Sequence, residues 1–253
     1  MGRYLTNEQV ARARDELSLL YSLPYSIDLV GTAWEQILAE IKGGSWTEKR
    51  DNRPRPDVTV TEGDKSVNYS VKTERLRTTG RLQTAADFLG HSEDLIVARP
   101  KVDELLAPGE KVESLSADQL GRKVLEYYNA RIVRAYQWDV LSILLRVEDN
   151  EFIYWEERPA PTYDPDGFWW RDSGRATGDN RNINGYPVAV RQAGALPLPR
   201  AKFKWTSGGK QFYVLYAIPN DADTWKITRT DLSIEEVREA LRDKLRAKQQ
   251  GRG

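Results

Sequence analysis

The sequence predicts a single α/β (α+β) domain over residues 1–253, with a mixed central β-sheet flanked by helices. Segments near both ends and in the middle of the chain repeat apolar residues at helical spacing. Between them, shorter segments alternate apolar and polar residues or are apolar throughout, as strands do. Because no internal repeat and no long linker divides the chain, one layered domain accommodates these elements best.

Start and stop signals place the helices. Thr6 is an N-cap candidate for the first helix, which Pro24 ends. The Gly43-Gly44 pair closes the second helix, and Ser233 with Glu236 forms a capping box for the last one. The predicted helices are residues 6–23, 26–41, 82–89, 116–137 and 233–250.

The chain is organised around a predicted β-hairpin in residues 52–74. Its two strands alternate apolar and polar residues, and Gly63-Asp64 supplies a tight turn. This turn sets Val58 opposite Tyr69 and Asp57 opposite Ser70. Further strands are predicted at residues 94–100, 140–148, 152–158 and 210–219.

Polar groups gather on one face of this hairpin. Residues opposed across two strands share a face, so Asp57, Asn68, Ser70 and Lys72 converge on the side that we expect to lie away from the core. A carboxylate and an amine held there on a rigid sheet predict a catalytic site.

Composition limits the chemistry that such a site can perform. The 38 basic and 38 acidic residues balance, so any polyanionic partner must meet a local patch. The absence of a signal-like start and of a membrane-length apolar segment indicates a cytoplasmic protein. The chain contains no cysteine, and its single histidine, His91, is read as a helix-cap or surface residue. Carboxylates, lysine and hard metals such as Mg²⁺ therefore remain for catalysis.

Asp57 and Lys72 are the central candidates for catalysis. Asp57 suits a metal ligand, and Lys72 can orient or deprotonate water and offset negative charge. Ser70 offers only a weak hydroxyl ligand, so another acid must complete the metal shell. Glu35 on the second helix is the best candidate, and Glu74 and Glu62 are alternatives.

These residues resemble the PD-(D/E)xK nuclease superfamily, which includes many type II restriction endonucleases. The matching elements are Pro56-Asp57, Ser70-Val71-Lys72 on the next strand, and a preceding helix that carries Gly31-Thr32-Ala33-Trp34-Glu35. The chain departs from the family pattern at Ser70, where Asp or Glu is usual. The resemblance covers roughly residues 26–100, which would form the catalytic core of the domain.

The resemblance implies a restriction-endonuclease-like core, Mg²⁺ as cofactor, double-stranded DNA as substrate and, usually, a homodimer. It implies Asp57, Glu35 and Val71 as the metal site and Lys72 as the catalytic lysine. The expected activity is a type II restriction endonuclease that cuts at a short sequence. The alternatives are a DNA-binding protein that does not cleave, and a repair or nicking endonuclease.

A later region is expected to recognise DNA. Residues 162–210 are rich in Gly, Pro, Asn, Arg and aromatic residues and read as long loops on the scaffold. Arg and Asn side chains can form hydrogen bonds with base edges. A glycine-rich surface loop with no role in recognition would have the same composition. Trp169 and Trp170 are taken as core residues. Candidate phosphate contacts are Arg53, Arg55, Arg77 and Arg81, and candidate base readers are Arg171, Arg175, Asn180, Arg181, Asn182, Asn184, Lys204 and Lys210.

Overall fold

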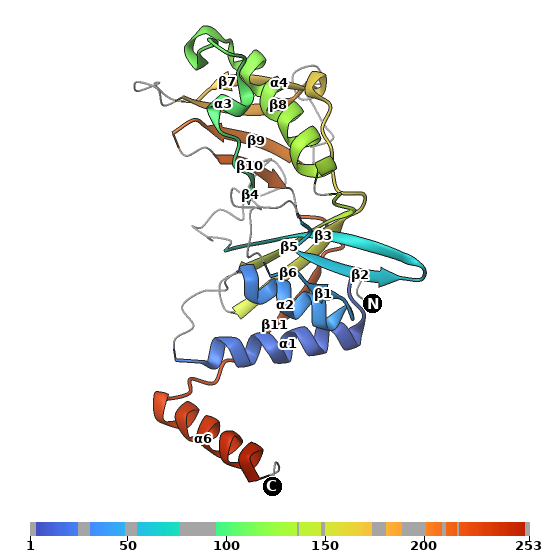
Figure 1. Cartoon of the computed structure of the whole chain (residues 1–253), viewed down its shortest axis with the longest axis vertical. Helices are drawn as coiled ribbons and strands as arrows, with labels where there is room; N and C mark the ends of the chain where they lie inside the picture. The colour runs from blue at the N-terminus through green and yellow to red at the C-terminus, as the bar shows by residue number, and fades with distance from the viewer. Residues whose placement is uncertain are drawn as a thin grey trace.

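Two β-sheets, each with helices of its own, make up the computed structural model of the chain (Figure 1). A sheet of six strands has the order β1-β2-β3-β5-β6-β11, and a sheet of five has the order β4-β10-β9-β8-β7. The structure describes residues 4–24, 31–48, 55–75, 95–135, 137–147, 150–173, 181–188, 201–208, 211–216 and 218–250.

The six-stranded sheet is mixed. Its strands β3 and β5 pair in parallel, whereas its other neighbours are antiparallel. This confirms the predicted α+β class with a mixed sheet. The strands are β1 (Ser45–Trp46), β2 (Val58–Glu62), β3 (Lys65–Arg75), β5 (Val140–Val147), β6 (Glu151–Glu157) and β11 (Asp223–Lys226).

Helices α1 (Asn7–Ser22) and α2 (Gly31–Ile41) cover one face of this sheet. Thr6 caps α1 in a capping box with Gln9, as the sequence predicts. The apolar face of α2 buries Trp34 and Leu38 against strand residues such as Val58 and Tyr154. Burying apolar surface of this kind supplies about 25 cal/mol per Å², so this layer holds the hairpin in place.

The five-stranded sheet contains β4 (Leu95–Ala98), β7 (Phe168–Asp172), β8 (Asn182–Pro187), β9 (Ala201–Thr206) and β10 (Gln211–Tyr216). Helix α4 (Ala117–Tyr127) packs on it so closely that a Cβ at Gly121 would lie 2.1 Å from the Trp170 ring. The core between them includes Phe203 and Trp205 and continues to Leu141 and Ile143 of the other sheet. The second face of the six-stranded sheet is therefore buried as well.

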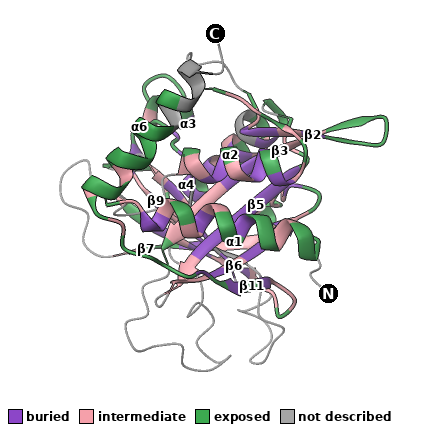
Figure 2. Cartoon of the chain, turned by 90° about the horizontal axis from the view of Figure 1, so that it is seen from below, coloured by how far each residue is buried: buried purple, intermediate pink, exposed green. Residues whose placement is uncertain are grey.

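The remaining elements are short or peripheral. Helix α6 (Ile234–Gln250) begins at the predicted capping box, in which the Glu236 N–H donates to Ser233 Oγ at 3.2 Å. It extends from the body beyond α1 in Figure 1 and is largely exposed in Figure 2. The others are α3 (Val102–Leu105), η1 (Val112–Ser114), the π-helical η2 (Tyr128–Arg134) and η4 (Pro165–Gly167).

The expectation of long loops over residues 162–210 is wrong for the residues described there. Strands β7, β8 and β9 lie in this region, and they bury Trp170, Ile183 and Phe203. Trp170 lies in the core as expected, whereas the same expectation for Trp169 is wrong, because it is half-buried on the opposite face of β7. The short strands β1 and β11 were also not predicted, and the helix predicted over residues 82–89 lies outside the described residues.

No helix in the described part of the chain is both long and apolar enough to cross a membrane.

Candidate functional site

The hairpin of β2 and β3 has the predicted register. Val58 pairs with Tyr69, Val60 with Val67, and the chain turns at Gly63-Asp64. Gly63 adopts a φ of +62°, a conformation that glycine adopts without strain. The turn projects from the body of the protein in both views (Figures 1 and 2). Asp57, at the opposite end of β2, lies next to the sheet core.

The Asp57 carboxylate is fixed by the backbone of β3. The Asp57 N–H donates to the Tyr69 carbonyl at 2.9 Å, and Asp57 Oδ2 accepts from the Val71 N–H at 2.7 Å. Only 3% of the residue is exposed. A hydrogen bond between an ionised carboxylate and a backbone N–H is stronger than a neutral one, so β3 determines where this negative charge lies.

Lys72 brings a positive charge to the same place. Its Nζ lies 4.0 Å from Asp57 Oδ2 and 5.2 Å from the centroid of the Trp138 ring. The ammonium also donates to the Val71 carbonyl at 3.3 Å. About a fifth of the Lys72 side chain is exposed (19%), so solvent reaches the lysine but barely reaches the aspartate.

Ser70 lies opposite Asp57 when the register is continued by one pair, and it is fully buried. Its Oγ has no hydrogen-bond partner among the described residues. The expectation that this face lies away from the core is wrong. Strand β5 pairs with β3, and Leu141 and Ile143, the partners of Ser70 and Lys72, belong to the core that the two sheets share. Asn68, assigned to the same group, instead joins Thr59 and the turn before β5.

Glu35 is buried rather than solvated, with 7% of the residue exposed. Its Oε2 accepts a hydrogen bond from Trp46 Nε1 at 3.0 Å. Trp46 pairs with Val58, the neighbour of Asp57, so this contact ties Glu35 to the Asp57 end of β2. Burying a carboxylate is costly, and the hydrogen bond from Trp46 offsets part of this cost.

The two alternative acids differ in position. Glu62 lies at the turn end of β2, about 16 Å from Asp57 at roughly 3.3 Å per strand residue. It accepts two hydrogen bonds from Arg158, at 2.9 and 3.0 Å. Glu62 is thus unsuited to share a metal ion with Asp57. Glu74 shares a strand face with Lys72, and its Oε1 accepts from the Arg75 N–H at 3.1 Å.

The candidate donors are of the chemical type that Mg²⁺ takes. Mg²⁺ is usually held by one or two carboxylates, with water and substrate phosphates as further ligands. Asp57 and Glu35 are buried acids, and the Ser70 hydroxyl, opposite Asp57 in the continued register, is an unsatisfied polar atom. In the described part of the chain, no three acidic or histidine residues are grouped closely enough to form a complete site.

A buried charge cluster under α2 was not predicted from the sequence. Lys42 Nζ lies 2.7 Å from Glu156 Oε1, with 8% and 3% of the two side chains exposed. Glu156 also accepts from Arg158 Nε at 2.9 Å and from the Tyr154 hydroxyl at 2.6 Å. The cluster ties the C-terminal end of α2 to β6. Its charges are scattered in the sequence, and no local spacing indicates that they meet.

The candidate DNA contacts that the structure describes lie mostly on the five-stranded sheet. Arg171, Asn182, Asn184 and Lys204 are on β7, β8 and β9, and Arg55 precedes the hairpin as an exposed residue. Six of the remaining candidates lie outside the described residues, namely Arg53, Arg77, Arg81, Arg175, Asn180 and Lys210.

Arg181 has a structural contact instead. Its guanidinium forms two hydrogen bonds with Asp172, at 2.6 and 3.1 Å, and donates to the carbonyls of Val112 and Leu115 at 2.9 and 2.6 Å. Its side chain is 13% exposed. In this conformation Arg181 joins the η1 segment to the sheet and does not present its donors to a base.

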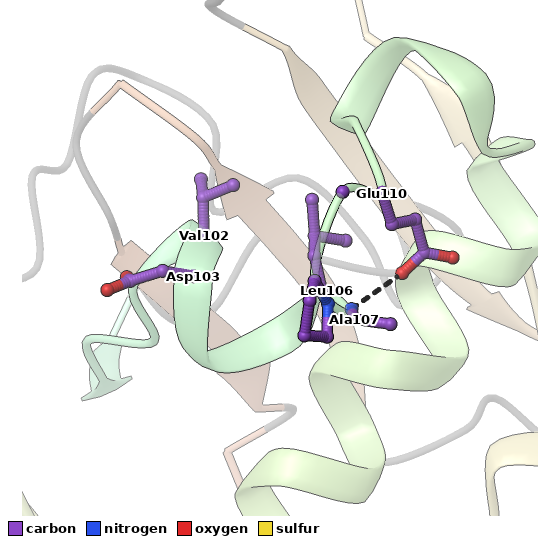
Figure 3. Close-up of a pocket in the computed structure, with 7 residues that line it drawn as sticks. Val102, Asp103, Leu106, Ala107 and Glu110 are labelled. Atoms are coloured by element: carbon purple, nitrogen blue, oxygen red, sulfur yellow. Dashed lines mark hydrogen bonds between the residues drawn. The ribbon is translucent and has the colours of Figure 1, made fainter.

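A surface hollow beside α3 lies apart from these residues (Figure 3). Its lining includes Val102, Leu106 and Glu110, and the Glu110 carboxylate accepts from the Ala107 N–H at 3.0 Å. This hydrogen bond is the main cause that holds the pKa of Glu110 below its ordinary value, followed by one from Lys123. The carboxylate closes a loop, and the hollow has no set of groups for catalysis.

Comparison of the chain with protein-family models, with curated proteins and with solved structures finds no match.

Proposed function

We propose that the chain is a Mg²⁺-dependent deoxyribonuclease of the PD-(D/E)xK type that hydrolyses double-stranded DNA at a short sequence, as type II restriction endonucleases do. The observation that carries this proposal is the approach of Lys72 to a buried Asp57, at 4.0 Å. Together the two side chains supply a carboxylate that can bind a metal ion and a cation that can offset negative charge on a phosphate, which are two of the groups that phosphodiester hydrolysis needs. A protein of this type would act in the cytoplasm.

Each residue has a distinct role in this proposal. Asp57 and Glu35, or Glu74 in place of Glu35, would hold the metal ion with the Val71 carbonyl nearby. Bound Mg²⁺ would polarise the phosphate and lower the pKa of a bound water molecule. Lys72 orients the attacking water and offsets the negative charge that grows on the phosphorus oxygens. Trp46 keeps the Glu35 carboxylate in position through its hydrogen bond.

The proposed homodimer has a candidate contact in α6. Ile234, Val237 and Leu241 lie at helical spacing on one stripe, and Leu241 is 56% exposed. The sequence of α6 begins with Glu235 and Glu236 and ends with an excess of Lys and Arg. An antiparallel pair of α6 helices would cover the stripe and set acidic halves against basic halves, because opposite charges attract across such a seam.

A second candidate function is DNA binding without cleavage. Ser70 replaces the usual second acid, and the described residues contain no complete three-acid group. A chain that had lost one ligand would retain the fold and the basic contacts but not the reaction.

Incubation with a plasmid of mixed sequence in Mg²⁺ tests the proposed activity. We expect discrete fragments from the wild-type protein, none from Asp57→Asn or Lys72→Ala, and unchanged fragments from the controls Asp64→Asn and Lys65→Ala. Each control removes a charge of the same sign as the residue that it matches, Asp64 for Asp57 and Lys65 for Lys72, at the exposed turn of the same hairpin.

Other outcomes of this experiment would overturn the proposal. A gel shift in Ca²⁺ with no cleavage in any divalent metal would favour the binding protein. Single-strand nicks would favour a repair endonuclease. Cleavage that survives in both Asp57→Asn and Lys72→Ala would show that the reaction takes place elsewhere.

A further inference from the structure

The outer face of the five-stranded sheet carries a row of polar and aromatic side chains. Since strand residues alternate between faces, the face opposite Trp170 and α4 is defined by the pairing register. Arg171 pairs with Asn184, Asn184 with Lys204, and Lys204 with Tyr213. The outer-face residues whose side chains the structure describes on β7 to β10 are Trp169, Arg171, Asn182, Asn184, Tyr186, Lys204, Thr206, Gln211 and Tyr213.

The rings and cations of this face are arranged in contact with each other. Trp169 and Tyr186 stack with centroids 4.9 Å apart and an interplanar angle of 24°. The Arg171 guanidinium lies 5.0 Å from the Tyr186 ring, and Lys204 Nζ lies 5.0 Å from the Tyr213 ring. None of the nine residues is acidic, and all nine are half-buried or exposed. The face therefore combines positive charge with aromatic surface.

We propose that this outer face binds a single-stranded segment of nucleic acid. Unstacked bases pack on aromatic rings, and arginine and lysine contact the phosphates between them. The Asn184 and Asn182 amides supply donors and acceptors for base edges in the same row.

The width of the sheet argues against a duplex on this face. Five strands at about 4.8 Å spacing span roughly 19 Å, whereas the major groove of B-DNA is about 12 Å wide and admits a helix or a two-stranded ribbon. The interior strands β8 and β9, which carry Asn184 and Lys204, have a neighbouring strand on each side, so they cannot enter a groove as a two-stranded ribbon does. This revises how the predicted base readers would work, because they would read a strand whose bases are already unpaired.

The proposal is independent of the cleavage site, since it concerns binding alone. If both hold, the substrate has a single-stranded arm beside a duplex, and the repair endonuclease becomes the better description of the enzyme.

Fluorescence anisotropy with a labelled DNA strand of about 20 nucleotides, measured in EDTA, tests the proposal. Its RNA counterpart and its duplex are measured in parallel. We expect the wild-type protein to bind at least one single strand more tightly than the duplex. Tyr213→Leu and Trp169→Leu should each weaken that binding by roughly five- to 150-fold, since stacking is worth about 1–3 kcal/mol per base.

Matched controls separate this effect from general damage. Tyr127→Leu is the control for Tyr213→Leu, because it removes a half-buried tyrosine from α4. Lys204→Gln should also weaken strand binding, and its control is Lys226→Gln, which removes a lysine from the other sheet. Circular dichroism and thermal unfolding check that each variant is folded. Binding unaffected in folded Tyr213→Leu and Lys204→Gln, tighter binding of the duplex, or no binding of either strand would overturn the proposal. Loss of cleavage in Asp57→Asn with strand binding intact bears only on the proposed nuclease site.

Discussion

The carboxylate of Asp57 accepts a hydrogen bond at 2.7 Å from the backbone N–H of Val71, on the neighbouring strand. The acid is therefore part of the hairpin ladder as well as a candidate catalytic group. Substitutions at this position change stability and chemistry by different amounts, and the two contributions can be measured separately.

Asp57→Asn and Asp57→Ala should both abolish cleavage but differ in stability. The asparagine carbonyl can still accept from Val71, whereas alanine leaves a buried N–H without a partner, at a cost of about 1–3 kcal/mol. Urea unfolding should therefore show Asp57→Ala to be the less stable variant. Equal free energies of unfolding would show that the 2.7 Å hydrogen bond is energetically unimportant.

The buried pair of Lys42 and Glu156 predicts an asymmetry between two substitutions. Without Glu156, Lys42 keeps a 3.4 Å hydrogen bond to the Tyr4 carbonyl, the Tyr69 ring and a weak attraction to Glu62. Without Lys42, Glu156 still has Arg158 and Tyr154. We expect Glu156→Met to cost about 3–5 kcal/mol of unfolding free energy, and Lys42→Met to cost less.

The double variant Lys42→Met/Glu156→Met supplies the control for this pair. Because it leaves no unpaired lysine, it should be more stable than Glu156→Met alone. A double variant whose losses simply add would mean that the two side chains do not interact.

The pair of Glu62 and Arg158 predicts a stability difference that depends on pH. Hydrogen bonds from Arg158, and less strongly its charge, lower the pKa of Glu62 from the ordinary value of 4.5. A carboxyl whose pKa falls on folding stabilises the protein above its unfolded-state pKa, and this stabilisation is lost as the pH falls through the lower folded-state value.

Wild-type protein should therefore be more stable than Glu62→Gln at neutral pH, with the difference shrinking below about pH 4.5. The effect should be small, since 43% of the Glu62 side chain is exposed and solvent screens the pair. Thermal unfolding of both proteins across this range measures it. A difference that grows on acidification would contradict the assigned direction.

Leu241→Glu should convert a dimer into a monomer if α6 forms the subunit contact. A carboxylate on the apolar stripe would repel its counterpart and lose the buried apolar surface. Light scattering after size-exclusion chromatography measures the mass. Leu19→Glu is the matched control, because Leu19 is 57% exposed on α1 and lies off the stripe. A wild-type monomer at high concentration would remove the proposed contact.

The sequence by itself determined the local elements of this protein. The Thr6 capping box, the Gly63-Asp64 turn and the pairing of Val58 with Tyr69 follow from short-range preferences and strict side-chain alternation. For the same reason, the meeting of Asp57 and Lys72 was predictable, since both lie on one hairpin.

Only the tertiary structure decided which surfaces are covered. It buried the Ser70 face in the core that the two sheets share, placed Glu35 against Trp46 and joined Lys42 to Glu156 across more than 100 residues of sequence. It also turned the expected loop region into a sheet around Trp170 and Phe203. Burial depends on contacts between distant segments, and periodicity within one segment shows which side is apolar but not what packs against the other side.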